Sequence, residues 1–235
     1  MKQRAKPIKA HELLKRLEGD EAYQARMEAA KEQRNRMAAM HRAAEAPIIE
    51  ELRATGYTVN TLDELRRSGA RYASAIPILL KWLPLVTESS VKESIVRCLS
   101  VPWAKPEAAK PLIAAFRSAS LNSAAGVKWT IANALEVVAD KTVFTDLSEL
   151  VRDPEHGKAR EMLAVALGNI NDPRAVEVLL TLLDDESIAG HAIMALGKLC
   201  APQARARIER FLNHPKAWVR RQAERALQKI DHSHG

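Results

Sequence analysis

The sequence lacks the features that several classes of protein require. Phe, Trp and Tyr make up 4% of its residues, there are two cysteines, and no apolar stretch is long enough to cross a bilayer. The longest apolar run, residues 75–86, is interrupted by Lys81. Residues 1–17 contain no apolar core of about 7–15 residues, which argues against a secretory signal. We therefore expect a cytoplasmic protein that does not bind membranes.

Motifs that carry chemistry are missing as well. There is no Gly-rich phosphate loop, no nucleophile elbow and no paired-Cys motif. The seven histidines are scattered, and the closest pair, His232 and His234, lies in a terminal tail, 231–235, that we expect to be disordered. The sequence predicts no catalytic residue, no metal site and no cofactor, so we expect a protein that is not an enzyme.

The positive charge is concentrated at the two ends of the chain. The net charge is +7, of which residues 1–45 carry +4 and residues 202–235 carry +5, whereas residues 72–201 carry −2. A stripe that binds nucleic acid would more naturally run along the body of the chain. Nucleic acid is therefore the weaker candidate partner, and a protein is the stronger one.

What is present is a repeat. A Leu preceded by a small residue, which we call the anchor leucine, recurs at intervals of 29–36 residues: Leu99, Leu135, Leu167, Leu196 and Leu227. Around each anchor, apolar residues follow helical spacing, and turns that often contain Pro separate a first helix from a second helix that carries the anchor. Helix pairs of this kind bury their apolar faces by stacking on their neighbours. The predicted fold is all-α, a right-handed α-solenoid of about five helix pairs over residues 72–230, after a non-repeating helical extension over residues 1–71.

The two cysteines fall in different repeats. Cys98 and Cys200 are three repeats apart, or about 30 Å if stacked helices are about 10 Å apart. A disulfide does not reach across that distance. We expect both thiols to be reduced.

One segment of the repeat resembles a known family. Residues 168–176, Gly-Asn-Ile-Asn-Asp-Pro-Arg-Ala-Val, follow Ala166-Leu167 and resemble the short HEAT-like repeats of the phycobilin-lyase type. The resemblance extends over residues 72–230 and is weaker in the second repeat, which has Glu136 where later copies have Gly168 and Gly197. The resemblance concerns the scaffold, which does not by itself carry function. The uninterrupted five-copy array without a catalytic motif predicts a non-enzymatic scaffold that recognises another protein through its curved surface. Alkylpurine DNA glycosylases are also HEAT-like, so a nucleic-acid-binding relative of those enzymes remains the alternative.

A basic residue recurs seven positions before the anchor leucine in four of the five repeats. We call these residues the basic ladder: Lys92, Lys128, Arg160 and Arg220. The ladder could bind an acidic peptide or a phosphate backbone, or its members could bond to acids in neighbouring turns, namely Asp153, Asp184 and Asp185. We favour the second role, and the ladder remains the best candidate in the sequence for contact with a partner.

Trp129 is a further candidate for partner binding because it directly follows Lys128 in a second helix. An aromatic residue at helical spacing is more often part of a core than of a site. We therefore expect Trp129 to be buried.

The two ends of the repeat are predicted to be capped. The fifth repeat has Glu224 at the position that is apolar in the earlier copies, which predicts a polar terminal face. At the other end, Pro47 is predicted to end a long helix and to open another that closes near Gly56, and residues 61–64 form a capping box. We expect five apolar residues of this region to cover the first repeat: Ile48, Ile49, Leu52, Leu62 and Leu65. The sequence indicates neither the identity of the partner nor the oligomeric state.

Overall fold

The computed structural model describes residues 9–119 and 126–233. Helices and turns account for these residues, and no strand occurs among them. The chain divides into two compact units, Met1–Ala46 and Pro47–Gly235. The predicted boundary between residues 71 and 72 falls inside the second unit.

The first unit consists of α1 (Ala10–Glu18) and the part of α2 (Glu21–Ala54) that precedes Pro47. Asp20 precedes α2, and its carboxylate accepts the backbone N–H of Tyr23 at 3.0 Å. Met27, Met37 and Met40 are exposed on this part of α2. This helix therefore buries little apolar surface of its own.

The predicted helix break at Pro47 is wrong, because α2 continues through this residue to Ala54. A proline inside a helix removes one N–H bond and costs about 3 kcal/mol. The residues that follow offset this cost, since Ile48, Ile49 and Leu52 are buried in the second unit. The continuity of the helix is thus decided by packing after the proline.

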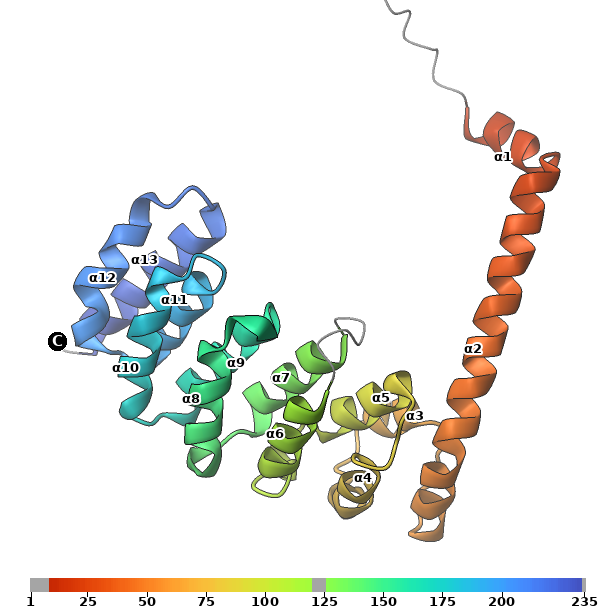
Figure 1. Ribbon diagram of the computed structural model, residues 1–235, viewed down its shortest axis with the longest axis horizontal. Helices are drawn as coiled ribbons and strands as arrows, with labels where there is room; N and C mark the ends of the chain where they lie inside the picture. Colours follow the sequence, from red (N-terminus) through yellow and green to blue (C-terminus); the bar gives the residue numbers. More distant parts are fainter. Residues whose placement is uncertain (1–8, 120–125, 234–235) are drawn as a thin grey trace, which may run out of the picture. The chain divides into compact units, whose positions relative to one another are not determined.

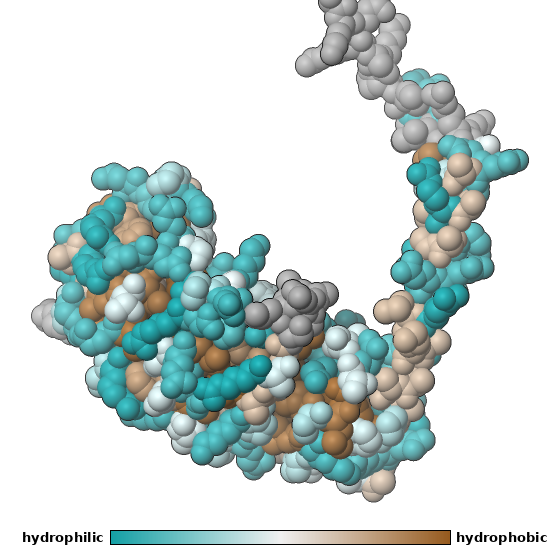
Figure 2. All heavy atoms as spheres, in the orientation of Figure 1, coloured by the Kyte–Doolittle hydropathy of each residue, from teal (hydrophilic) through white to brown (hydrophobic). Residues whose placement is uncertain are grey.

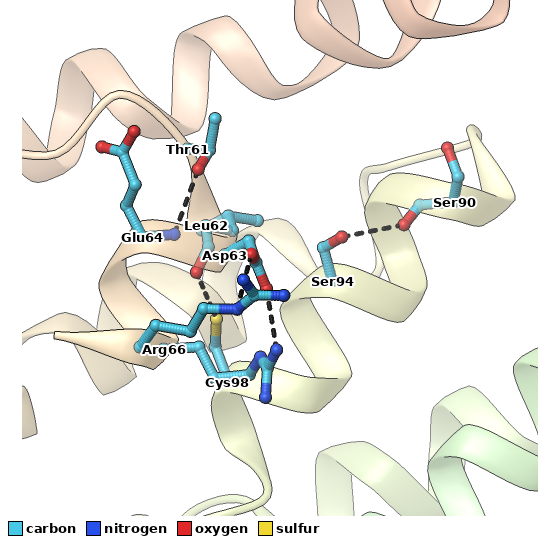
Figure 3. Close-up of polar contacts among 9 residues, drawn as sticks. Thr61, Leu62, Asp63, Glu64, Arg66, Ser90, Ser94 and Cys98 are labelled. Atoms are coloured by element: carbon cyan, nitrogen blue, oxygen red, sulfur yellow. Dashed lines mark hydrogen bonds and ion pairs between the residues drawn. The ribbon is translucent and has the colours of Figure 1, made fainter. Parts of the chain in front are cut away.

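The second unit begins with the end of α2 and with α3 (Leu62–Arg67), which packs against α5. The Thr61 side chain caps α3 by accepting the backbone N–H of Glu64 at 3.1 Å (Figure 3). The Glu64 carboxylate accepts the N–H of Asn60 at 2.7 Å, so the reciprocal half of the capping box reaches one residue beyond the predicted position. Leu62 and Leu65 are buried, as expected.

Five helix pairs follow within the described residues (Figure 1). The first helices are α4 (Ile76–Trp82), α6 (Ala109–Ser118), α8 (Phe144–Arg152), α10 (Arg174–Thr181) and α12 (Arg205–Glu209). The second helices are α5 (Ser89–Leu99), α7 (Gly126–Val138), α9 (Ala159–Ile170), α11 (Ala189–Lys198) and α13 (Ala217–His232). Short 3₁₀ helices complete the connections: η1 (Ala73–Ala75), η2 (Pro102–Ala104), η3 (Lys141–Val143), η4 (Pro154–His156), η5 (Leu182–Asp184), η6 (Pro202–Ala204) and η7 (Arg210–Asn213). Residues 120–125, between α6 and α7, lie outside the described residues.

The second helices pack on one another in chain order, from α3 and α5 to α13, and each first helix packs on the second helix of its own pair. The anchor leucines lie in this interface and are at most 9% exposed. The fold is therefore an α-solenoid, and the all-helical repeat prediction is confirmed.

Two glycines set the spacing of the last second helices. A Cβ atom on Gly168 would lie 2.8 Å from the Cβ of Ala195, and one on Gly197 would lie 2.6 Å from that of Ala226. Such contacts are too short for a side chain, so glycine at these positions allows α9, α11 and α13 to approach closely. In α7 the equivalent residue is Glu136, whose backbone carbonyl accepts the side-chain amide of Asn169 at 2.8 Å.

The last helix ends the stack with a polar face. Glu224, Arg221, Arg225 and Gln228 are exposed on α13, whereas the residues equivalent to Glu224 in the earlier repeats are fully buried: Val96, Ala132, Ala164 and Ile193. α13 continues to His232, so the first residues of the predicted disordered tail are helical. His234 lies outside the described residues.

Neither Cys98 nor Cys200 forms a disulfide. Cys98 is buried on α5, where its thiol donates to the carbonyl of Leu62 at 3.2 Å and ties α5 to α3 (Figure 3). Cys200 is half-buried and follows α11 with a backbone φ of 47°. It therefore lies in the turn after the second helix and not on the packed face of that helix.

Candidate protein-interaction surface

The residues of the basic ladder lie on one side of their second helices. This side contacts the turns of the same repeat and of the next repeat. Arg160 is 5% exposed, and its guanidinium donates to the carbonyl of Val151 and to the carboxylate of Asp185, both at 2.7 Å. Arg220 donates to the backbone carbonyls of His214 and Pro215 at 2.7 and 3.0 Å. These two arginines use their guanidinium groups to hold turns in place.

The two lysines of the ladder also lie against the protein. The Lys128 ammonium is 5.1 Å from the centre of the Phe116 ring and 3.4 Å from Nδ1 of His156. Lys92 is half-buried at a groove between α4 and α6, where Figure 2 shows hydrophobic residues at the surface. The groove is lined otherwise by small and apolar residues: Leu80, Leu83, Pro84, Pro111, Ala114, Ala115 and Ser118.

Of the three acids expected to pair with the ladder, Asp185 alone has a ladder residue as its ion-pair partner. Hydrogen bonds from Ser187 and from Arg160 lower the pKa of Asp185. Asp184 instead pairs with Arg207 and Arg210 at 2.6 and 3.0 Å. Asp153 lies 3.7 Å from Nε2 of His156, so the expectation for Asp153 and Asp184 is wrong. Both acids belong to turns, whose direction the repeat pattern does not specify.

Trp129 is 45% exposed, so the prediction that it is a core residue is wrong. It occupies the position directly after the ladder residue Lys128, six residues before the anchor leucine. At this position the side chain of Trp129 points away from the stacked helices. Asn133 follows one turn later on the same face, is half-exposed, and donates its amide to the carbonyl of Trp129 at 2.7 Å. Trp129 and Asn133 therefore define an accessible face of α7.

Equivalent positions on the neighbouring second helices carry carboxylates. Glu93 occupies this position on α5 and pairs with Arg97 at 2.8 Å, and Glu161 occupies it on α9. On α11 the position is Gly190, and the indole of Trp218 from α13 lies in the space that a side chain there would fill. We call these four residues the exposed row, in which the two indoles are exposed and the two carboxylates are half-buried: Glu93, Trp129, Glu161 and Trp218.

Glu161 and Trp218 share a hollow of about 350 Å³ with His191. The carboxylate of Glu161 is 3.8 Å from Nε2 of His191, and the His191 ring is 4.7 Å from the Trp218 ring, centre to centre. Trp218 is 38% exposed, and Glu186, Ser187 and Lys216 complete the polar part of the lining. Burial lowers the pKa of His191, although the nearby Glu161 raises it. The net effect favours the neutral imidazole at pH 7.

Glu161, His191 and Trp218 were not among the candidates predicted from the sequence. Glu161 and Gly190 share the position of Trp129 in the repeat register, so comparing that position across the repeats would have drawn attention to it. Trp218 offers no such signal, because it comes from the start of α13 and reaches the row through the gap at Gly190.

No group of three or more His, Cys, Asp or Glu residues that could hold a metal ion occurs in the part of the chain that the structure describes. The same residues contain no helix that is long and apolar enough to span a membrane.

A protein-family model and two solved structures are similar to this chain. Residues 122–189 match the family model of HEAT repeats. A designed armadillo repeat protein is 17% identical, with a TM-score of 0.49 over 82% of this chain and 92% of that one. An engineered protein is 25% identical, with a TM-score of 0.43 over 73% and 87% of the two chains. None of the curated proteins compared with the chain matches it.

Proposed function

We propose that this HEAT-like repeat protein is a non-enzymatic protein-binding module, and that its partner binds along the exposed row of the second helices. The observation that carries the proposal is the exposure of both row indoles, 45% for Trp129 and 38% for Trp218. Tryptophan contributes disproportionately to binding energy at protein interfaces. An exposed indole in a fold with few aromatic residues is thus a marker for an interface.

The rest of the second unit supports this choice of face. Its other exposed large apolar side chains, Leu85 and Leu212, lie in or beside turns. The first helices carry ion pairs with one another, including Arg117 of α6 with Asp146 and Glu149 of α8 at 2.8 and 2.9 Å. These charged groups have partners within the chain, whereas the indoles of Trp129 and Trp218 remain exposed.

The basic ladder does not enter the proposal as a contact surface. The guanidinium groups of Arg160 and Arg220 have acceptors within the chain, and a phosphate backbone would have to compete with these bonds. The nuclease treatment in the experiment below distinguishes binding of nucleic acid from binding of a protein.

Photo-cross-linking from the full chain tests the proposal. A benzophenone amino acid at Asn133, one turn from Trp129, is expected to cross-link a protein in native lysate, whereas the same probe at Glu177, exposed on α10, is expected not to. Trp129→Ala should abolish the cross-link, and Leu85→Ala, which truncates an apolar side chain that is 60% exposed away from the row, should preserve it.

The proposal is overturned if both probes give the same products or if Trp129→Ala leaves the cross-link intact. It is also overturned if nuclease treatment abolishes the cross-link, because the bound molecule would then be nucleic acid or would depend on it.

A further inference from the structure

The hollow between Glu161 and Trp218 contains a carboxylate whose ion-pair partner is a histidine and not an arginine or lysine. The Glu161 side chain is 25% exposed, and its partner His191 carries charge only when protonated. The neighbouring Arg160 binds Asp185 instead. Because burial lowers the pKa of His191, the ring is mostly neutral at pH 7 and does not supply a full positive charge to Glu161.

The remaining walls of the hollow also favour a positive charge. Trp218 presents an indole ring, the side chain that attracts cations most strongly through its π face. Glu186 adds a second carboxylate and Lys216 one ammonium, so the lining carries a net charge of −1 when His191 is neutral. A guanidinium group could stack on the indole and donate to Glu161 at the same time.

The row beyond the hollow repeats the same two kinds of side chain. Trp129 lies on α7 and Glu93 on α5, so carboxylates and indoles alternate along the row from Glu93 to Trp218, which fills the position of Gly190 on α11. The equivalent position on α13 itself is Arg221, which is exposed beyond the end of the row. Stacked helices are about 8–10 Å apart. A polyproline II segment has three residues per turn and advances about 3.1 Å per residue, so every third side chain lies on the same face, about 9 Å further along. Cations at every third position of such an extended segment would therefore match successive second helices.

We infer that the partner presents an extended basic segment to the exposed row, with an arginine side chain between Glu161 and Trp218. This inference rests on the proposed function and names the chemistry of the partner. The positive charge of this segment is opposite to that of the acidic peptide or phosphate backbone that the basic ladder would bind.

A synthetic peptide tests the inference directly. The probe is a fluorescent 12-residue peptide with arginine at every third position and serine or alanine elsewhere. Matched peptides carry citrulline, the neutral isostere, or glutamate at the same positions. We expect saturable binding of the arginine peptide by fluorescence anisotropy and no binding of the other two.

Variants locate the site. Glu161→Gln keeps the shape of the side chain and should weaken binding of the arginine peptide at least tenfold. Glu177→Gln removes the same charge from α10 and should leave the affinity within about twofold, which controls for non-specific attraction. Circular dichroism and melting curves verify that both variants fold. If Glu161→Gln does not fold, Glu186→Gln takes its place, because Glu186 lies at an exposed position of the same hollow. Glu186→Gln should then weaken binding of the arginine peptide.

The inference is overturned if the arginine peptide does not bind, if the citrulline or glutamate peptide binds as well, or if the Glu161→Gln and Glu177→Gln variants behave alike. If the cross-link at Asn133 still depends on Trp129 in that case, the protein-binding function stands and the basic partner alone is rejected. Loss of both results rejects the proposed function as well.

Discussion

Trp218 lies against Gly190, and its six-membered ring fills the space that a side chain at residue 190 would occupy. The indole therefore reaches the position that Trp129 and Glu161 hold on α7 and α9, although it belongs to the following helix. The exposed row is therefore continuous across α11 only because the Trp218 side chain from α13 fills the space beside Gly190.

Gly190→Ala should displace Trp218. A methyl group at this position would overlap the indole, which is the nearest neighbour and has to move. We expect the affinity for the arginine peptide to fall at least fivefold and the free energy of unfolding to fall by about 1–3 kcal/mol. Peptide titration and chemical denaturation measure the two effects. An unchanged indole N–H resonance of Trp218 in the variant would contradict this placement.

Binding of the arginine peptide should weaken as the pH falls through the pKa of His191. Burial lowers this pKa below its usual value of 6.5, so the ring is neutral at pH 7 and gains a proton only in more acidic solution. The protonated ring would offset the charge of Glu161, and with Lys216 it would bring the net charge of the lining from −1 to zero, since Glu186 is the other carboxylate and Trp218 is uncharged. Anisotropy titrations from pH 5 to pH 8 measure the effect.

His191→Gln is the control for this pH dependence. The variant cannot be protonated in this range, so its affinity should change much less between pH 5 and pH 8. If wild type and variant lose affinity in parallel, another group is responsible and His191 is not the sensor.

Arg160→Ala should destabilise the fold because Arg160 joins α9 to the carbonyl of Val151 and to Asp185. Loss of charged hydrogen bonds at a buried site costs about 1–3 kcal/mol. Lys92→Ala removes a ladder residue whose ammonium has no hydrogen bond among those observed, and it should cost less. Urea unfolding of both variants tests the difference, and equal costs would show that the ladder has one uniform role.

Removal of residues 1–46 should leave a folded second unit. The cut coincides with the boundary between the compact units, and it places Pro47 at the start of the remaining helix, where its missing N–H is harmless. The expected result is a cooperative thermal transition within a few degrees of that of the full chain. Aggregation or loss of cooperativity would show that the first unit belongs to the core.

Repetition made the fold predictable from the sequence. The anchor leucines, the five helix pairs and the polar face around Glu224 all follow from comparing one repeat with the next. Where a residue has no counterpart in other repeats, prediction was weaker. The continuation of α2 through Pro47 depends on burial of Ile48 and Leu52, which local preferences do not include.

The candidate surface was predictable only in part. The ladder was found by its spacing, but spacing alone did not show that Arg160 and Arg220 bind turns of the protein itself. Trp129 was predicted as a candidate for partner binding, but its exposure was not. Trp129 is one residue after Lys128 and therefore points in another direction from the helix. Trp218 joins the row through its contact with Gly190 of the preceding repeat. The repeat spacing in the sequence does not reveal such a contact between different positions of two repeats.

The central claim is that partners bind the exposed row, and the four indole N–H resonances test it most directly. Trp82 and Trp103 serve as internal controls, because the Trp82 indole nitrogen donates to Glu51 at 2.8 Å and that of Trp103 is buried. On titration of ¹⁵N-labelled protein with the arginine peptide, the resonances of Trp129 and Trp218 should shift together and saturate, while those of Trp82 and Trp103 should stay in place. Shifts at Trp82 or Trp103 with none at Trp129 and Trp218 would contradict the account.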